Sequence, residues 1–285
     1  MKNTVCIVGG DMRQIRLSEL LKKEGYTVYS LGLSEDDSDF DVLRKASIVI
    51  FPMPVSFDDV YINAPFSKKQ IAKSKVLGML PEGVFVLGGR ISEVMERELT
   101  AKGLEFADYY KREELIVKNA IPTAEGALEI ALSEMPTTIF GSKCLVTGFG
   151  RVGKVMAKKL KALDADVTVS ARKYGDFAWI EEAGMKPIHT EDLPLFVGGF
   201  DLIVNTVPSL ILTEEVLKRV KEGALIIDLA SKPGGVDFSA AKRLGKNVIW
   251  ALSLPGKTAP LTAGDIIKEA VVNILSERRQ EVEWT

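Results

Sequence analysis

The chain has 285 residues, enough for two domains that each bury a core, and its formal net charge is −2. Hydrophobic residues make up 46% and charged residues 27%. The absence of a basic excess or of a long run of one charge argues against a nucleic-acid partner. No apolar run at the N-terminus is long enough for a signal peptide or a membrane span. We therefore expect a cytoplasmic protein in which Cys6 and Cys144 are buried free thiols. No metal is expected, because the sequence contains no cluster with metal-ligand spacing.

The first part of the chain alternates short apolar segments with helical ones. Strands are expected at residues 5–8, 27–31, 47–51, 84–87 and 104–107, and helices at residues 13–24 and 91–102. The acidic segment at residues 35–41 is interpreted as a solvated loop. Short apolar strands separated by helices predict a parallel sheet that is covered on both faces.

A second part follows a predicted linking helix at about residues 123–135, which begins after Pro122. Its strands are expected near residues 143–147, 165–170, 201–205, 224–228 and 247–251. The last helix, predicted to start near residues 262–265 with a sequence like a capping box, returns the chain to the first part. The sequence therefore predicts an α/β protein with two doubly wound, Rossmann-like parallel-sheet domains and a cleft between them. The substrate-side domain, flavodoxin-like or Rossmann-like, is residues 1–122 plus 263–285, and the nucleotide-binding domain is residues 123–262.

The sequence G-F-G-R-V-G lies between the strand at residues 143–147 and a helical run, which is the setting of a dinucleotide-binding turn. The first glycine allows the tight turn, the second lets the backbone approach a pyrophosphate, and the third lets helix and strand pack closely. The predicted cofactor contacts in this turn are Gly148, Phe149, Gly150, Arg151, Val152 and Gly153.

The end of the next strand indicates which nicotinamide cofactor binds. NAD sites usually place an acidic residue there, whereas this chain offers Ser170, Arg172 and Lys173. A hydroxyl and two cations suit a 2′-phosphate, so NADP is predicted; the alternative is that the two cations are solvated loop charges. The ends of later strands add further cofactor contacts: Thr206, Val207, Pro208 and Asp228.

The only histidine, His189, follows a strand-like segment that is expected at the edge of the nucleotide-binding sheet. Many 2-hydroxy-acid dehydrogenases use a histidine as acid and base. Since His189 is expected beside the adenosine end of the cofactor, it is interpreted as a surface residue. This placement argues against chemistry of the lactate dehydrogenase type.

Several cations follow predicted strands, where ligands gather in doubly wound sheets. Arg13, Arg90, Lys111, Lys232 and Lys257 suit an anionic substrate such as a dicarboxylate. The segment at residues 9–11 is either a second anion site or a helix start with Asp11 as N-cap. The predicted substrate contacts are Asp11, Arg13, Arg90, Thr123, Ser231, Lys232, Lys257 and Thr258.

Two loops, LASKPGG at residues 229–235 and LPGKTAPLT at residues 254–262, resemble those of alanine-dehydrogenase-like two-domain proteins. Together with GGDMR at residues 9–13, AIPTAEGA at residues 120–127 and the glycine turn, they resemble more closely the dipicolinate synthase A-subunit family of spore-forming bacteria. The resemblance covers essentially the whole chain. It implies oxidation of a dihydrodipicolinate, or of its hydrated precursor from the lysine pathway, to pyridine-2,6-dicarboxylate in the mother cell during sporulation. It also implies a flavoprotein-like partner, the B-subunit of the synthase. A homo-oligomer is expected as well.

The hypothetical mechanism is loss of a hydride to the nicotinamide and of a proton to a base or to water. Glu125, Asp108 and Lys257 are the candidate bases, and Glu125 is equally well explained as a first-turn helix acid. Two other functions stay open. One is a different NADP-dependent dehydrogenase of an amino or keto acid, and the other is a non-catalytic nucleotide-binding subunit.

Overall fold

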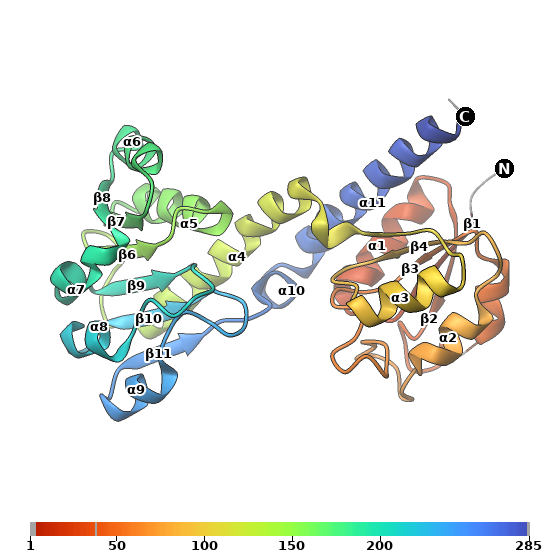
Figure 1. The fold of residues 1–285 in the computed structure, drawn as a ribbon, viewed down its shortest axis with the longest axis horizontal. Helices are drawn as coiled ribbons and strands as arrows, with labels where there is room; N and C mark the ends of the chain where they lie inside the picture. Colours follow the sequence, from red (N-terminus) through yellow and green to blue (C-terminus); the bar gives the residue numbers. More distant parts are fainter. Residues whose placement is uncertain (1–3, 38, 284–285) are drawn as a thin grey trace. The chain divides into compact units, whose positions relative to one another are not determined.

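A computed structural model of the chain describes residues 4–37 and 39–283 (Figure 1). The chain divides into two compact units, Met1–Asn119 with Ala259–Thr285, and Ala120–Thr258. The predicted divisions after residue 122 and before residue 263 lie within a few residues of these limits. The N-terminal unit therefore contains the end of the chain, and the backbone passes between the units twice.

The N-terminal unit is built on five parallel strands in the order β2-β1-β3-β4-β5. They are β1 (Thr4–Val8), β2 (Thr27–Leu31), β3 (Ile48–Ile50), β4 (Phe85–Gly88) and β5 (Phe106–Asp108). One face packs against α1 (Met12–Lys23) and α11 (Pro260–Glu283), and the other against α2 (Lys73–Met79) and α3 (Glu93–Ala101). Single 3-10 turns follow β2 and β5, at η1 (Phe40–Lys45) and η2 (Tyr109–Lys111). The strand order reverses between β1 and β3, where ligands bind in folds of this topology.

The second unit is built on six parallel strands in the order β11-β10-β9-β6-β7-β8. They are β6 (Lys143–Thr147), β7 (Asp166–Ala171), β8 (Lys186–His189), β9 (Leu202–Asn205), β10 (Leu225–Asp228) and β11 (Asn247–Trp250). Figure 1 shows α5 (Arg151–Ala162) and α6 (Tyr174–Glu182) on one face, with α7 (Leu193–Phe196), α8 (Glu214–Arg219) and α9 (Phe238–Arg243) on the other. The short η3 (Thr190–Asp192), η4 (Val197–Gly199) and α10 (Leu254–Thr258) complete the unit.

Side chains of the central strands alternate between two apolar cores. Cys144 and Val146 of β6 join the core under α5 and α6, whereas Leu145 between them joins the core under α7 to α9. Burial on both faces explains why these strands are continuous apolar runs in the sequence. The prediction of two doubly wound parallel-sheet domains is confirmed, and Cys6 and Cys144 are buried and free, as expected.

Two helix starts differ from the sequence-based expectation. The linking helix α4 (Glu113–Glu134) begins ten residues before the expected start and contains Pro122 in its interior. Leu115, Ala120 and Ala124 are all buried along it, so packing carries the helix through the proline, at the cost of one backbone hydrogen bond. Helix α11 begins at Pro260, a residue suited to the first turn, so the expected capping box at residues 262–265 lies inside the helix.

Candidate functional site

The turn between β6 and α5 contains three glycines, and the space around their Cα atoms differs. Gly148 has φ +90°, and a Cβ there would lie 2.7 Å from Val207 and 2.8 Å from Thr206. A Cβ on Gly153 would lie 2.1 Å from the carbonyl oxygen of Gly148. A Cβ on Gly150, in contrast, would meet no atom within 4 Å. The turn and the helix packing thus need two of the glycines, and the open space beside Gly150 suits a bound pyrophosphate.

The N-cap residue of helix α5 has no side chain that could accept the first backbone N–H groups of the helix. Its N-cap is Gly150, and its first turn contains no acidic residue. The uncapped N–H groups and the positive end of the helix dipole are suited to an anion. Arg151 and Val152 form the start of the helix, and Lys154 Nζ lies 5.2 Å from the ring centroid of Phe149. The six predicted residues therefore form one strand–turn–helix unit.

The end of β7 separates a buried hydroxyl from two exposed cations. Ser170 is fully buried, it pairs in register with Thr147, and its carbonyl accepts the N–H of Gly148 at 2.9 Å. Its Oγ has no hydrogen-bond partner in the part of the chain that the structure describes. Arg172 and Lys173 are exposed and form no ion pair within residues 4–37 and 39–283. The cations, and not the Ser170 hydroxyl, are the groups presented to solvent.

A row of buried polar side chains crosses the carboxyl end of the sheet. Thr147 Oγ1 donates to Asn205 Oδ1 at 2.6 Å, and Asn205 Nδ2 donates to Asp228 Oδ1 at 2.7 Å. The carboxylate of Asp228 also accepts the backbone N–H groups of Ala230 at 3.0 Å and Gly235 at 2.8 Å. Asp228 is thus held by three donors, and it fixes the loop after β10.

The loop after β9 is fixed by the same row. Asn205 Oδ1 accepts the N–H of Val207 at 3.1 Å, and Thr206 Oγ1 donates to the carbonyl of Thr147 at 2.8 Å. Pro208 follows at the surface. Asn205 ends the apolar strand β9, which marks it as a strand-end polar residue in the sequence, but no contact was assigned to it, whereas the structure makes it the centre of this row.

Four of the predicted substrate residues of this unit lie on two further segments. Ser231 and Lys232 are exposed in the loop after β10, and Lys257 is exposed on α10, next to the half-buried Thr258. A Cβ on Gly126 would lie 2.7 Å from Thr258 Oγ1, so this glycine allows α10 to pack against α4. Neither lysine forms an ion pair within the described residues. Both cations are therefore available to an anion.

In the N-terminal unit, the segment at residues 9–11 starts a helix and does not present an open anion site. Asp11 is the N-cap of α1 and accepts the backbone N–H of Arg13 at 3.0 Å. The Arg13 guanidinium forms an ion pair with Asp11 at 2.9 Å and donates to the carbonyl of Met53 at 2.7 Å. The N–H of Gly10 donates to the carbonyl of Asn63 at 2.7 Å. Asp11 thus supplies the negative charge that offsets the Arg13 cation at the positive end of the helix dipole.

Arg90 and Asp108 lie together at the carboxyl ends of β4 and β5. Asp108 Oδ1 accepts the backbone N–H groups of Arg90 at 3.0 Å and Tyr110 at 2.8 Å, and Oδ2 accepts that of Ile91 at 3.0 Å. Arg90 has φ +58°, which is uncommon for a residue with a side chain. Its guanidinium lies 5.1 Å from the ring centroid of Tyr110 and forms no ion pair within the described residues. Asp108 therefore fixes the backbone of Arg90, whose exposed guanidinium has no ion-pair partner among the described residues.

Comparison with known proteins gives matches over both units. Residues 4–110 match the model of the dipicolinate synthase A-subunit N-terminal domain, and residues 122–236 match the NAD-binding domain of D-isomer-specific 2-hydroxyacid dehydrogenases. The dipicolinate synthase A-subunit of Bacillus subtilis is 31% identical over 97% of this chain and 97% of its own length. This chain belongs to the dipicolinate synthase A-subunit family.

Solved structures agree with this membership. The dipicolinate synthase A-subunit from Bacillus halodurans superposes with a TM-score of 0.89 at 29% identity, over 96% of this chain and 98% of that one. A transhydrogenase from Sinorhizobium meliloti superposes with a TM-score of 0.72 at 15% identity, over 96% of this chain and 94% of that one, and shares the fold. An alanine dehydrogenase of Staphylococcus epidermidis is 24% identical over 70% of this chain and 53% of its own length. The match of residues 122–236 to the NAD-binding domain model shows a pyridine-nucleotide-binding domain of the dehydrogenase type, which supports an oxidoreductase. No helix within the described residues is long and apolar enough to span a membrane.

The three candidate bases of this chain have different surroundings. Glu125 is exposed on α4 and forms an ion pair with Lys159 of α5 at 2.8 Å. Asp108 accepts three backbone N–H groups, as described above, and Lys257 forms no ion pair within the described residues. Of the three, Lys257 is the one that the described part of the protein does not already engage. The predicted substrate contact Thr123 lies half-buried on α4, two residues before Glu125.

Proposed function

We propose that this chain is the redox subunit of a dipicolinate synthase, and that it oxidises dihydrodipicolinate to pyridine-2,6-dicarboxylate. The oxidant is NADP⁺, which leaves as NADPH, and the ring loses one hydride and one proton. In a spore-forming bacterium the reaction would serve the mother cell, together with a second synthase subunit. The observation that carries the proposal is the glycine turn with space beside Gly150, because it provides a place for the hydride acceptor.

The cofactor end of the site favours NADP over NAD. Arg172 and Lys173 follow β7, where an acidic residue would hold the free 2′-hydroxyl of NAD. Both are exposed and without an ion-pair partner in the described part of the chain. A planar guanidinium and an ammonium group complement a 2′-phosphate. The predicted contact of Ser170 would be indirect, because its hydroxyl is fully buried.

The charges near the strand ends indicate which cations could bind a substrate carboxylate. Arg13 is neutralised by Asp11 at 2.9 Å, and Lys111 by Glu96 at 2.8 Å. Arg90 has no such partner within the described residues, and its guanidinium can donate to both oxygens of a carboxylate. In the N-terminal unit Arg90 is thus the best candidate, and Lys232 and Lys257 are the equivalent candidates in the other unit.

The proton that leaves the ring needs little catalytic assistance, because aromatisation provides driving force. Asp108 already accepts three backbone N–H groups, and Glu125 is paired with Lys159. We therefore propose water as the proton acceptor, because a protonated Lys257 that binds a carboxylate has no lone pair with which to accept a proton. Asp108 then acts as a positioning residue that holds Arg90, and Glu125 as a helix-surface ion pair.

A reaction assay tests the function. Dihydrodipicolinate is generated enzymatically, the purified chain and NADP⁺ are added, and dipicolinate and NADPH are quantified with and without the second subunit. Equal amounts of both products above the chain-free control are expected. Dipicolinate that forms only when the second subunit is present, and without NADPH, would move the redox step to that subunit, leaving this chain as its nucleotide-binding partner. Turnover of pyruvate or alanine instead would favour an amino-acid dehydrogenase, the alternative suggested by the 24% identity to alanine dehydrogenase.

Variants at the strand ends test the assignment of roles. Arg90→Ala is expected to raise KM for dihydrodipicolinate about 10- to 100-fold, since a hydrogen bond to a charged group is worth about 1.5–3 kcal/mol. Asp108→Asn should raise KM through the displaced Arg90 while kcat stays close to that of the parent. Lys111→Ala is the matched control, because its ion pair with Glu96 already neutralises it. A collapse of kcat with an altered pH profile in Asp108→Asn would instead make Asp108 the base.

A further inference from the structure

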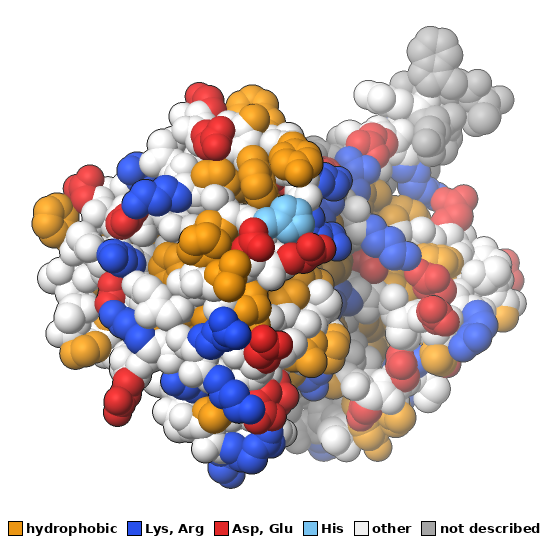
Figure 2. Space-filling view, turned by 60° about the vertical axis from the view of Figure 1, so that its left-hand side comes forward, with side chains coloured by type: hydrophobic (Ala, Val, Ile, Leu, Met, Phe, Trp, Pro, Cys, Tyr) orange, Lys and Arg blue, Asp and Glu red, His pale blue; other side chains and the backbone are white. Residues whose placement is uncertain are grey.

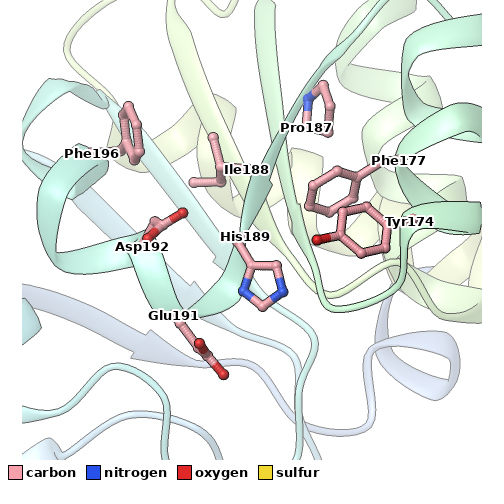
Figure 3. Close-up of a pocket in the computed structure, with 8 residues that line it drawn as sticks. All are labelled: Tyr174, Phe177, Pro187, Ile188, His189, Glu191, Asp192 and Phe196. Carbon is pink, nitrogen blue, oxygen red and sulfur yellow. The ribbon is translucent and has the colours of Figure 1, made fainter.

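A surface pocket of about 510 Å³ lies at the carboxyl end of β8, the edge strand of the six-stranded sheet (Figure 3). Its walls come from the start of α6, from β8 itself, and from the η3–α7 segment. Figure 3 shows Tyr174 and Phe177 on one side, Glu191, Asp192 and Phe196 on the other, and His189 between them. The pocket lies within one unit, so its geometry is fixed by that unit alone.

The walls of the pocket are largely aromatic, and two of the rings are unusually exposed. Tyr174 is 85% exposed and Phe196 is 49% exposed, and the adjacent Leu195 is 72% exposed. The rings of Tyr174 and Phe177 contact edge to face with centroids 5.9 Å apart, and those of Phe177 and His189 with centroids 6.1 Å apart. Grouped exposed aromatic side chains of this kind are typical of surfaces that bind another protein.

The mouth of the pocket carries negative charge that the described residues do not neutralise. Glu191 and Asp192 both line it, and neither forms an ion pair within residues 4–37 and 39–283. Figure 2 shows the single histidine next to acidic side chains, with hydrophobic side chains on one side and Lys or Arg side chains on the other. The cations that precede Tyr174, Arg172 and Lys173, are assigned above to the cofactor phosphate. The two carboxylates therefore remain as uncompensated charge.

The aromatic and acidic side chains that line the pocket indicate which kind of group could bind there. A guanidinium can stack on the rings and donate to the carboxylates, so both features favour a cationic side chain. A phosphate-bearing ligand would be repelled by Glu191 and Asp192. Pro187 in β8 lacks an N–H, which disfavours binding by addition of a strand to this edge. The pocket thus fits side chains of a folded partner, a cation flanked by apolar groups.

We propose that this pocket docks the second synthase subunit, which inserts an arginine flanked by apolar side chains. The inference rests on the proposed function for the existence of that subunit. His189 pairs in register with Ala171, the residue before Arg172, so the docked segment lies next to the loop that is assigned to the cofactor. Binding of the second subunit is thus placed beside the cofactor site of this one.

Calorimetric titration of the chain with the purified second subunit of the same organism tests the proposal. Glu191→Lys, Asp192→Lys and Tyr174→Ala are each expected to weaken binding at least tenfold, and added NaCl should weaken binding of the parent. Glu222→Lys and Phe140→Ala are matched controls, because they change an exposed acid and a 71% exposed ring that do not line the pocket. Binding to the controls should stay within twofold of the parent.

Three results would overturn the proposal. The first is unchanged binding of the second subunit to all three pocket variants, and the second is no binding to the parent chain. The third is a parent that self-associates on size-exclusion chromatography while the pocket variants are monomeric, which would make the pocket a contact between copies. NADPH binding to the variants is measured in parallel without the second subunit. A variant that keeps NADPH binding and loses the second subunit has lost docking alone, so the docking proposal is tested independently of the proposed oxidation.

Discussion

Alanine substitutions at Gly150 and Gly153 should separate cofactor binding from folding. The backbone of Gly150, at φ −79° and ψ −163°, suits any residue, and its Cβ would meet no atom within 4 Å. Gly150→Ala should therefore cost less than about 1 kcal/mol of unfolding free energy. The methyl group would fill the space assigned to the pyrophosphate and remove a hydrogen bond worth about 1.5–3 kcal/mol, which weakens NADPH binding about 10- to 100-fold.

Gly153→Ala should have the opposite profile. Its Cβ would lie 2.1 Å from the carbonyl oxygen of Gly148, which is backbone and cannot rotate away. Overpacking of this kind costs about 1–3 kcal/mol, so the thermal midpoint should fall by several degrees. Calorimetric unfolding and NADPH titration measure the two effects, with Gly199→Ala as a control because a Cβ there would also meet no atom within 4 Å. A stable Gly150→Ala variant that binds NADPH like the parent would refute the assignment of this space.

Three further predictions concern charge and burial. Arg172→Ala should weaken NADP⁺ binding at least tenfold in a titration and leave NAD⁺ binding unchanged; equal affinity of parent and variant for NADP⁺ would contradict the cofactor assignment. Burial raises the pKa of Cys6 to about 12 and that of Cys144 to about 11. Both thiols should therefore resist a thiol reagent at pH 8 until the chain unfolds, and fast labelling of the folded chain would contradict this. The free energy of unfolding should fall as the pH rises from about 8.5 through these pKa values, because the folded state favours the neutral thiols. Glu98→Ala should destabilise the chain more than Lys73→Met in urea unfolding, by about 1–3 kcal/mol, because the buried ammonium of Lys73 then keeps only the carboxylate of Asp59 at 3.9 Å and loses that of Glu98 at 2.7 Å.

Features that depend on neighbouring residues could be predicted from the sequence. The glycine turn is set by its place between a strand and a helix, and in the structure Gly148 and Gly153 have close neighbours, whereas Gly150 faces open space. The interpretation of Asp11 as a helix N-cap, one of two left open, is confirmed for the same reason. Both are local arrangements in which spacing along the chain decides the geometry.

Features that depend on distant residues could not be predicted. The ion pair of Glu125, a candidate base, with Lys159 could not be predicted, because the two residues are 34 positions apart and only the fold brings them together. The row of Thr147, Asn205 and Asp228 forms only when three strands from different parts of the sequence align in register. The start of α4 was also missed, because Pro122 dominates the local pattern and the packing that carries the helix past it is tertiary.

Two carboxylates at strand ends are engaged in holding the backbone, and the chain has a single histidine, so the proposed reaction must proceed with little acid–base assistance. Asp108 accepts three backbone N–H groups and fixes Arg90, while Asp228 accepts three donors and fixes the loops of the nucleotide domain. Each acid is thus committed to shaping a strand end and is poorly placed to shuttle protons. A ring that becomes aromatic on losing a hydride needs a bound oxidant and held carboxylates more than it needs a strong base. The distribution of charge in this chain therefore favours an aromatising oxidation over reactions that depend on a histidine as acid and base.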